Sequence, residues 1–105
     1  MSAHTFDESA NGSTITVAVG EPVTLELEEI PTTGYRWHLD ADAGLAVASP
    51  EYAPYPTSGI GGGGVRRFVV TPQRPGDLRV RAGLWREWEG EGSTIKRFAL
   101  TLQAR

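Results

Sequence analysis

Apolar and polar residues alternate along most of this chain. Val23, Leu25 and Leu27 alternate with polar residues, which predicts a strand with one buried face and one wet face. No segment has the apolar period of an amphipathic helix. The pattern predicts about seven short strands, an all-β fold of the immunoglobulin-like antiparallel β-sandwich type. The other predicted strands cover residues 14–19, 35–39, 44–49, 65–71, 77–84 and 95–103.

The composition fits one turn-rich domain. The chain has 105 residues, of which 13 are glycine and 7 are proline, and 39% of its residues are hydrophobic. This length is typical of a single domain, and this hydrophobic content does not fit disorder. We expect a flexible N-terminal segment over residues 1–11 and the folded domain over residues 12–105. Residues 50–64 are rich in proline and glycine, which predicts a long loop.

The residues needed for most catalytic and metal sites are missing. The chain has no cysteine, which excludes disulfides, a thiol nucleophile and cysteine zinc sites. Its two histidines, His4 and His38, are far apart, and we expect a frayed terminus around the first and a solvent-facing position for the second. Glu28 and Glu29 are neighbours on a strand, so they point to opposite faces and cannot act on one substrate. We predict no enzyme, no metal and no cofactor.

The charge of the chain limits the classes of partner that we expect it to bind. The net charge is −3, which gives no reason to expect nucleic acid or an anionic membrane, and no apolar run reaches about 18 residues. Residues 1–60 carry most of the acidic side chains and residues 61–105 most of the basic ones, which we interpret as pairing between strands. The first residues lack a signal-peptide pattern. We expect a cytoplasmic protein if Met1 is the native start, and otherwise an exported one with its signal removed.

Three loops carry unusual residues. In the first, Pro31 fixes its own φ and Gly34 permits a positive φ, so the threonines between them project on a stiff turn. In the second, the glycines of residues 59–64 leave the backbone open to pair with an extended partner chain. In the third, Arg86 and Trp88 are residue types favoured as interface anchors. Read alone, the first two also fit an ordinary β-turn and a flexible connector.

In this order the three loops resemble the chagasin family of cysteine-peptidase inhibitors. That family is marked by N-P-T-T-G-[FY], then G-x-G-G, then R-P-W, on an immunoglobulin-like sandwich. The resemblance runs from about residue 12 to residue 105, and the glycine motif fits either residues 61–64 or residues 59–62. The matching residues, which the resemblance assigns to peptidase binding, are Pro31, Thr32, Thr33, Gly34 and Tyr35 in the first loop, Gly61, Gly62, Gly63 and Gly64 in the second, and Arg86 and Trp88 in the third.

The resemblance implies a function. Family members inhibit papain-like cysteine peptidases reversibly by filling the active-site cleft with the three loops, and a monomer is enough for this. Two positions depart from the motifs, since Ile30 replaces an asparagine and Glu87 replaces a proline. These departures keep open an alternative, an immunoglobulin-like binding or adhesion module without inhibitory activity. Competition with substrate at a peptidase active site distinguishes the two.

Overall fold

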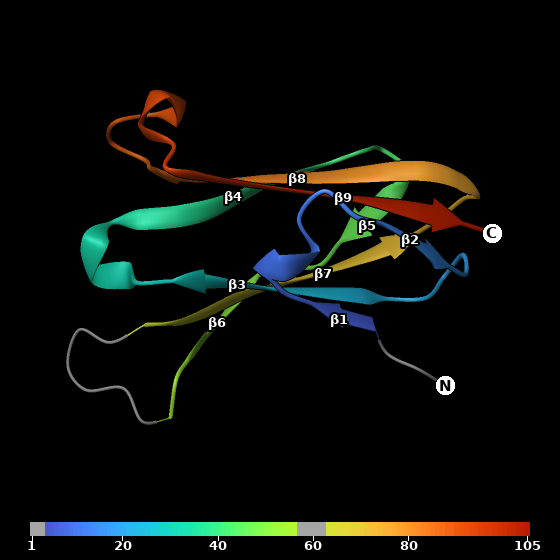
Figure 1. Cartoon of the computed structure of the whole chain (residues 1–105), viewed down its shortest axis with the longest axis horizontal. Coiled ribbons are helices and arrows are strands. Elements are labelled where there is room, and N and C mark those ends of the chain that lie inside the picture. The colour runs from blue at the N-terminus through green and yellow to red at the C-terminus, as the bar shows by residue number, and fades with distance from the viewer. Residues whose placement is uncertain (1–3, 57–62) are drawn as a thin grey trace.

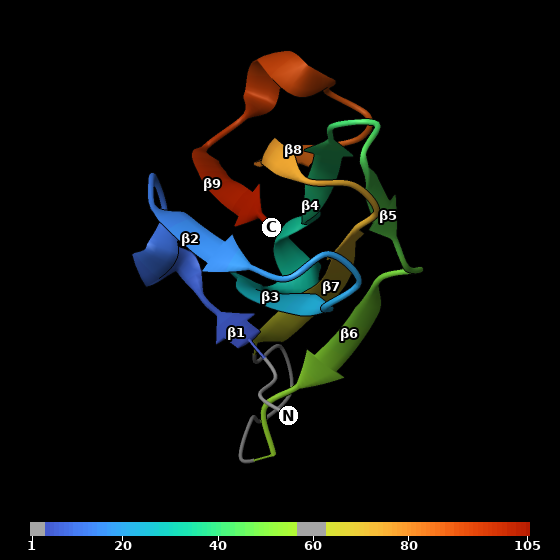
Figure 2. The same ribbon diagram turned by 90° about the vertical axis from the view of Figure 1, so that its right-hand side faces the viewer.

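The computed structural model describes residues 4–56 and 63–105, which form two β-sheets packed face to face (Figures 1 and 2). In each sheet the strands are named in spatial order. One sheet contains β1 (His4–Phe6), β3 (Val23–Glu29), β7 (Gly64–Pro72) and β5 (Leu45–Val47), with β6 (Glu51–Pro54) also paired to β7. The other contains β2 (Thr14–Val17), β9 (Lys96–Ala104), β8 (Gly76–Arg86) and β4 (Tyr35–Ala41).

The core lies between the two sheets and follows the alternation in the sequence. Val23, Leu25 and Leu27 on β3 are fully buried, because every second side chain of a strand points to the same face. The facing sheet supplies Trp37 from β4 together with alternate residues of β8 and β9. The largest fully buried side chains of that sheet are Leu78, Phe98, Leu100 and Leu102.

The predicted all-β sandwich is confirmed, with two differences in detail. The described residues form nine strands rather than about seven, because β1 and β6 carry no clear alternation. The pairing is not antiparallel throughout: β1 runs parallel to β3, and β2 runs parallel to β9. Both parallel strands are short and lie at an edge of their sheet, where a single neighbour fixes their direction.

Two segments that we expected to be irregular contain regular structure. Glu51–Pro54, inside the long loop predicted for residues 50–64, forms β6 and pairs with β7. Within residues 1–11, His4–Phe6 forms β1 and Glu8–Ala10 forms the 3₁₀ turn η1. His4 therefore does not lie in a frayed terminus, and its Nε2 atom is 3.2 Å from Glu21. The domain boundary near residue 11 stays a prediction.

The acidic and basic parts of the chain pair across strands, as their distribution suggested. Glu26 on β3 pairs with Arg67 on β7 at 2.8 Å, and Asp40 on β4 pairs with Arg81 on β8 at 3.1 Å. The four side chains are between 32% and 77% exposed. Each pair therefore contributes at most about 1 kcal/mol to the stability of the fold. Both pairs join residues that are directly opposite each other in the strand register.

The first loop (residues 30–34) joins β3 to β4, the second (residues 55–63) joins β6 to β7, and the third (residues 87–95) joins β8 to β9. The first and third loops lie at one end of the sandwich, on the left in Figure 1, and the described residues 55, 56 and 63 of the second loop adjoin the strands at that end. The strand register brings their ends together, since Gly64 is opposite both Glu29 and Pro54, and Tyr35 is opposite Arg86. No helix within residues 4–56 and 63–105 is long and apolar enough to span a membrane.

Candidate functional site

The first loop is a closed turn with an exposed tip. Pro31–Thr33 forms the 3₁₀ turn η2, and Gly34, with φ of +81°, ends it. Proline suits the first position of such a turn and glycine the left-handed position that ends it. The backbone N–H of Thr33 donates to the carbonyl of Ile30 at 3.1 Å, and that of Gly34 donates to Pro31 at 3.0 Å. The turn thus uses its own hydrogen bonds and leaves Pro31, Thr32 and Thr33 exposed.

The third loop is braced at its base by backbone and serine contacts. The N–H of Gly90 donates to the carbonyl of Arg86 at 2.9 Å. The Ser93 hydroxyl donates to the carbonyl of Gly90 at 2.8 Å and accepts from the N–H of Arg86 at 3.1 Å. These bonds close the base of the loop, where the motif has a proline at the position of Glu87. The loop carries Trp88, whose side chain is 72% exposed.

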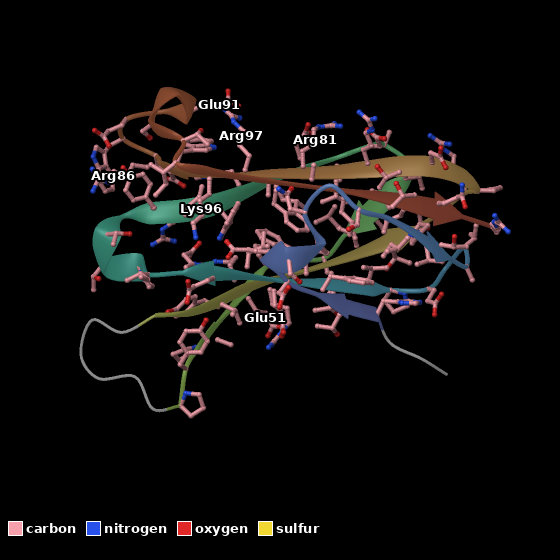
Figure 3. All side chains as sticks on the ribbon, in the orientation of Figure 1. Glu51, Arg81, Arg86, Glu91, Lys96 and Arg97 are labelled. Atoms are coloured by element: carbon pink, nitrogen blue, oxygen red, sulfur yellow. The ribbon has the colours of Figure 1, made fainter. Side chains whose placement is uncertain are left out.

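Arg86 and Trp88 join the third loop to the first, at the end where Figure 3 labels Arg86. The Nε of Arg86 donates to the carbonyl of Thr33 at 3.0 Å, and its guanidinium lies 4.3 Å from the centre of the Tyr35 ring. The Trp88 indole lies directly on Gly34, so that a Cβ atom at this glycine would overlap the ring. The guanidinium is also 5.7 Å from the Trp88 ring, which adds a cation–π contact. The two loops therefore form one surface.

The described ends of the second loop lie against the first loop. A Cβ atom placed on Gly63 would be 3.1 Å from Ile30 Cγ1 and 3.7 Å from Tyr55 Cε2. Gly64 is buried where β6 and β7 come together, and a Cβ atom there would overlap the carbonyl of Ala53. Gly64 is therefore required by the packing of the sheet. Gly63 and Gly64 thus help to position the second loop, and do not only leave its backbone accessible.

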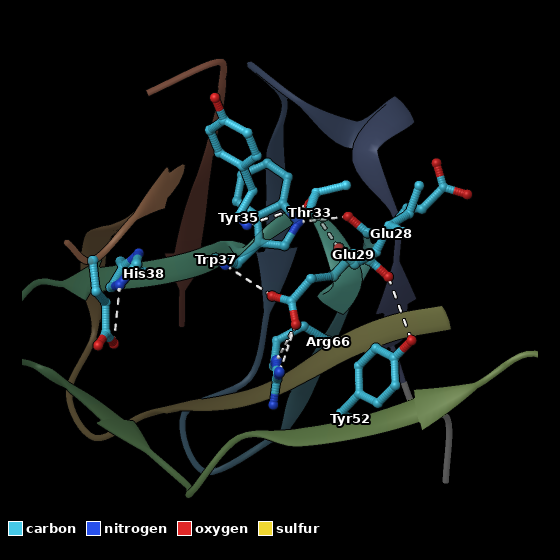
Figure 4. Close-up of polar contacts among 10 residues, drawn as sticks. Glu28, Glu29, Thr33, Tyr35, Trp37, His38, Tyr52 and Arg66 are labelled. Atoms are coloured by element: carbon cyan, nitrogen blue, oxygen red, sulfur yellow. Dashed lines mark hydrogen bonds and ion pairs between the residues drawn. The ribbon is translucent and has the colours of Figure 1, made fainter. Parts of the chain in front are cut away.

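A buried carboxylate ties together the strands that carry the first and second loops (Figure 4). Glu29, the last residue of β3, is 1% exposed. Its Oε1 accepts the backbone N–H of Trp37 on β4 at 2.9 Å, and its Oε2 accepts both Nε, at 3.1 Å, and Nη2 of Arg66 on β7. The Tyr52 hydroxyl on β6 donates to the Glu29 carbonyl at 3.5 Å. One residue thus contacts three neighbouring strands below the loops.

The neighbouring Glu28 points to the other face and holds the second loop. The hydroxyl of Tyr55 donates to Glu28 Oε2 at 3.1 Å. Loss of solvent around this hydroxyl, and then its contact with the Glu28 carboxylate, raise the pKa of Tyr55 above its usual value. The hydroxyl therefore stays protonated and donates throughout the physiological pH range.

His38 lies on the outer face of its sheet, and its side chain is 26% exposed. It stacks on Trp85 with 3.5 Å between ring centroids. Its Nε2 is 3.7 Å from Glu87, the contact that the dashed line beside His38 marks in Figure 4. Among residues 4–56 and 63–105, no three histidine, aspartate or glutamate side chains gather to hold a metal ion.

Comparisons with known proteins decide the family. The model of the chagasin family peptidase inhibitors I42 matches residues 16–102. Chagasin from Trypanosoma cruzi is 32% identical over 108 residues, which covers 97% of this chain and 98% of the relative. The chain belongs to the chagasin family.

Solved structures share the fold of this family member. The cysteine protease inhibitor EhICP2 from Entamoeba histolytica superposes with a TM-score of 0.85 at 17% identity, over 98% of this chain and 95% of that one. PbICP-C, solved in complex with falcipain-2, gives 0.68 at 16% identity, over 99% and 90%. The predictions of the chagasin family, of an inhibitor of cysteine peptidases and of a protein that is not an enzyme are confirmed.

The structure places nine of the eleven predicted binding residues, and their roles stay predictions. Pro31, Thr32, Thr33, Gly34 and Tyr35 adjoin Arg86 and Trp88 in one surface, while Gly64 begins β7 beside it and Gly63 directly precedes that strand. Gly61 and Gly62, and the choice between glycine registers 59–62 and 61–64, lie outside the described residues.

The sequence analysis missed the structural role of Glu29 and Arg66. Glu29 continues the inward phase of Val23, Leu25 and Leu27, so its position on the core face was visible in the alternation. An ionised carboxylate on the core face needs hydrogen-bond or charge partners. A glutamate at a core position was therefore the signal that the sequence offered. Its partner is 37 residues away in the sequence, and alternation alone does not identify it.

Replacing Glu29 with alanine should destabilise the chagasin-family fold strongly. Glu29→Ala leaves the largely buried Arg66 and the Trp37 N–H without their acceptor, and we expect a loss of about 3–5 kcal/mol in the free energy of unfolding, as for other broken buried pairs. Glu26→Ala, which breaks a half-exposed pair on the same strand, should cost at most about 1 kcal/mol. Urea unfolding measures both, and equal losses would contradict the role of Glu29.

Replacing Gly34 with alanine should separate the third loop from the first. Gly34 and Gly20 both have a positive φ, +81° and +88°, but a Cβ atom at Gly20 would meet nothing within 4 Å, whereas one at Gly34 would overlap Trp88. Alanine at a left-handed position such as Gly34 adds backbone strain of about 1–2 kcal/mol. We expect Gly34→Ala to cost more than Gly20→Ala, because it adds the clash with Trp88, and to shift the indole N–H resonance of Trp88 in NMR spectra. An unshifted resonance in folded Gly34→Ala would show that the indole does not rest on this glycine.

Proposed function

We propose that this chain, a cysteine-peptidase inhibitor by family, acts on papain-like peptidases by placing its three loops together in the active-site cleft. The inhibition is reversible and needs one copy of the chain. The observation that carries the proposal is the position of Trp88, which is 72% exposed and yet packs on Gly34, 5.7 Å from the guanidinium of Arg86. Exposed aromatic side chains with fixed positions are typical anchors of protein interfaces.

The fixed position of Trp88 favours tight binding. Binding normally costs about 0.5–1.5 kcal/mol for each side chain that becomes ordered at an interface. Contacts with the first loop already restrict the indole, so less of this cost remains when the peptidase binds. Arg86 supports the same geometry by its hydrogen bond to Thr33. In the proposed complex, Trp88 packs on an apolar surface beside the catalytic cleft.

The shape of the first loop explains how a peptidase binds it without cutting it. Cleavage requires the scissile bond to lie in line with the catalytic nucleophile. Residues Pro31–Thr33 form a 3₁₀ turn with its own hydrogen bonds, and Arg86 holds the Thr33 carbonyl. This turn occupies the cleft in a geometry that does not match the transition state, so occupancy alone gives no cleavage. The second loop supplies backbone groups from its glycine segment beside the turn.

Titration against papain, with a small peptide substrate, tests the proposed function. We expect competitive inhibition at nanomolar to low-micromolar concentrations, and mass spectrometry should recover the inhibitor uncut. Absence of inhibition by folded protein at tens of micromolar, against papain and a cathepsin L-like peptidase alike, would favour a binding module without inhibitory activity.

Truncating Trp88 should weaken inhibition strongly. Trp88→Ala removes the proposed anchor, and we expect a loss of about 2–4 kcal/mol in binding free energy, or about 30-fold to 1,000-fold in the inhibition constant. Val47→Ala is the matched control, because Val47 is an exposed apolar residue on β5, away from the loops (46% exposed). Equal inhibition constants for the two folded variants would remove the third loop from the mechanism.

A further inference from the structure

Exposed apolar side chains gather around the loops. Within residues 4–56 and 63–105, the exposed large apolar residues are Val19, Ile30, Val47, Tyr55, Trp88 and Ile95. Four of these six belong to the three loops, whereas Val19 and Val47 lie elsewhere. Exposed apolar surface that is concentrated at one place indicates an interaction site. The proposed anchor accounts for Trp88 but not for Ile30 or Tyr55.

Ile30 and Tyr55 both lie beside Gly63, the residue before β7. A Cβ atom placed on Gly63 would be 3.1 Å from Ile30 Cγ1 and 3.7 Å from Tyr55 Cε2. The backbone N–H of Tyr55 donates to the carbonyl of Gly63 at 3.1 Å. Ile30 is 42% exposed and Tyr55 is 39% exposed. We call these two side chains the Ile30–Tyr55 patch.

The patch is held in position on both sides. The carbonyl of Ile30 accepts the hydroxyl of Thr33 at 2.7 Å and the backbone N–H of the same residue. The hydroxyl of Tyr55 is fixed by Glu28 at 3.1 Å. An apolar surface that is already ordered binds at a smaller entropic cost.

We infer that the Ile30–Tyr55 patch is a second apolar contact with the target peptidase and selects peptidases whose cleft rim is apolar at that place. The inference rests on the proposed function, because the patch is continuous with the first and second loops that enter the cleft. The motif has asparagine where this chain has Ile30, so a side chain able to form hydrogen bonds is absent here. Polar groups of a peptidase that face the patch would lose their hydrogen bonds to water and gain no hydrogen-bond partner, which weakens binding.

Inhibition constants of four variants against papain and a cathepsin L-like peptidase test this inference. We expect Ile30→Asn and Tyr55→Ala to raise the inhibition constant about tenfold or more against the more sensitive enzyme. The factors for the two enzymes should differ, because their cleft rims differ, whereas a general loss of structure would weaken both equally. Tyr55→Phe keeps the ring and loses only the bond to Glu28, so its effect should be smaller than that of Tyr55→Ala. Val47→Asn, a polar replacement at an equally exposed residue away from the loops, should have no effect.

The outcomes separate this inference from the proposed function. Unchanged inhibition by folded Ile30→Asn and Tyr55→Ala, with Trp88→Ala still weakened, would overturn the patch alone. Equal losses for Tyr55→Phe and Tyr55→Ala would also overturn it, because the hydroxyl rather than the ring would then matter. Wild-type protein that inhibits neither peptidase would overturn the proposed function and the patch together. If Tyr55→Ala does not fold, Ile30→Asn decides, since its exposed side chain makes no hydrogen bond.

Discussion

The carboxylate of Glu29 is the interaction on which the loop end of this sandwich depends. Among the described residues it is the charged side chain that the core encloses, and such a charge is stable only with good partners. Those partners are the backbone of Trp37 on β4 and the guanidinium of Arg66 on β7. The pair thus fixes how β3, β4 and β7 meet. The first loop begins at the next residue, so its position follows from this contact.

The third loop adds a different constraint, in which side chains of one loop rest on the backbone of another. Trp88 lies on Gly34, and Arg86 donates to Thr33. Neither contact buries the tryptophan, which stays largely exposed. The same atoms therefore order the loops and remain available to a partner. This combination suits an inhibitor of the chagasin family, because a surface ordered in advance loses little entropy on binding.

The two departures from the family motifs lie beside contacts of the loop end. The third loop lacks the motif proline, and Ser93 and Gly90 close its base with hydrogen bonds. The Glu87 carboxylate is 3.7 Å from His38 Nε2. At the first loop, Ile30 brings an apolar group next to Gly63. Both changed residues thus lie in loops of the proposed binding surface.

The sequence by itself determined the strands, the turns and the residue types of the loops. Alternation is a local property, since every second side chain of a strand shares a face, and proline and glycine limit φ within a single residue. β6 escaped this reading because its proline, tyrosine and alanine do not alternate in polarity. The parallel direction of the two edge strands escaped it because alternation carries no information on strand direction.

Only the tertiary structure decided which of these residues meet. Arg86 lies 53 residues from Thr33, and Glu29 lies 37 residues from Arg66, and such contacts depend on sheet order and register. The contact of Trp88 with Gly34 depends further on the conformations of the first and third loops. Neither a residue type nor its spacing encodes these distances, because they arise from the packing of two whole sheets.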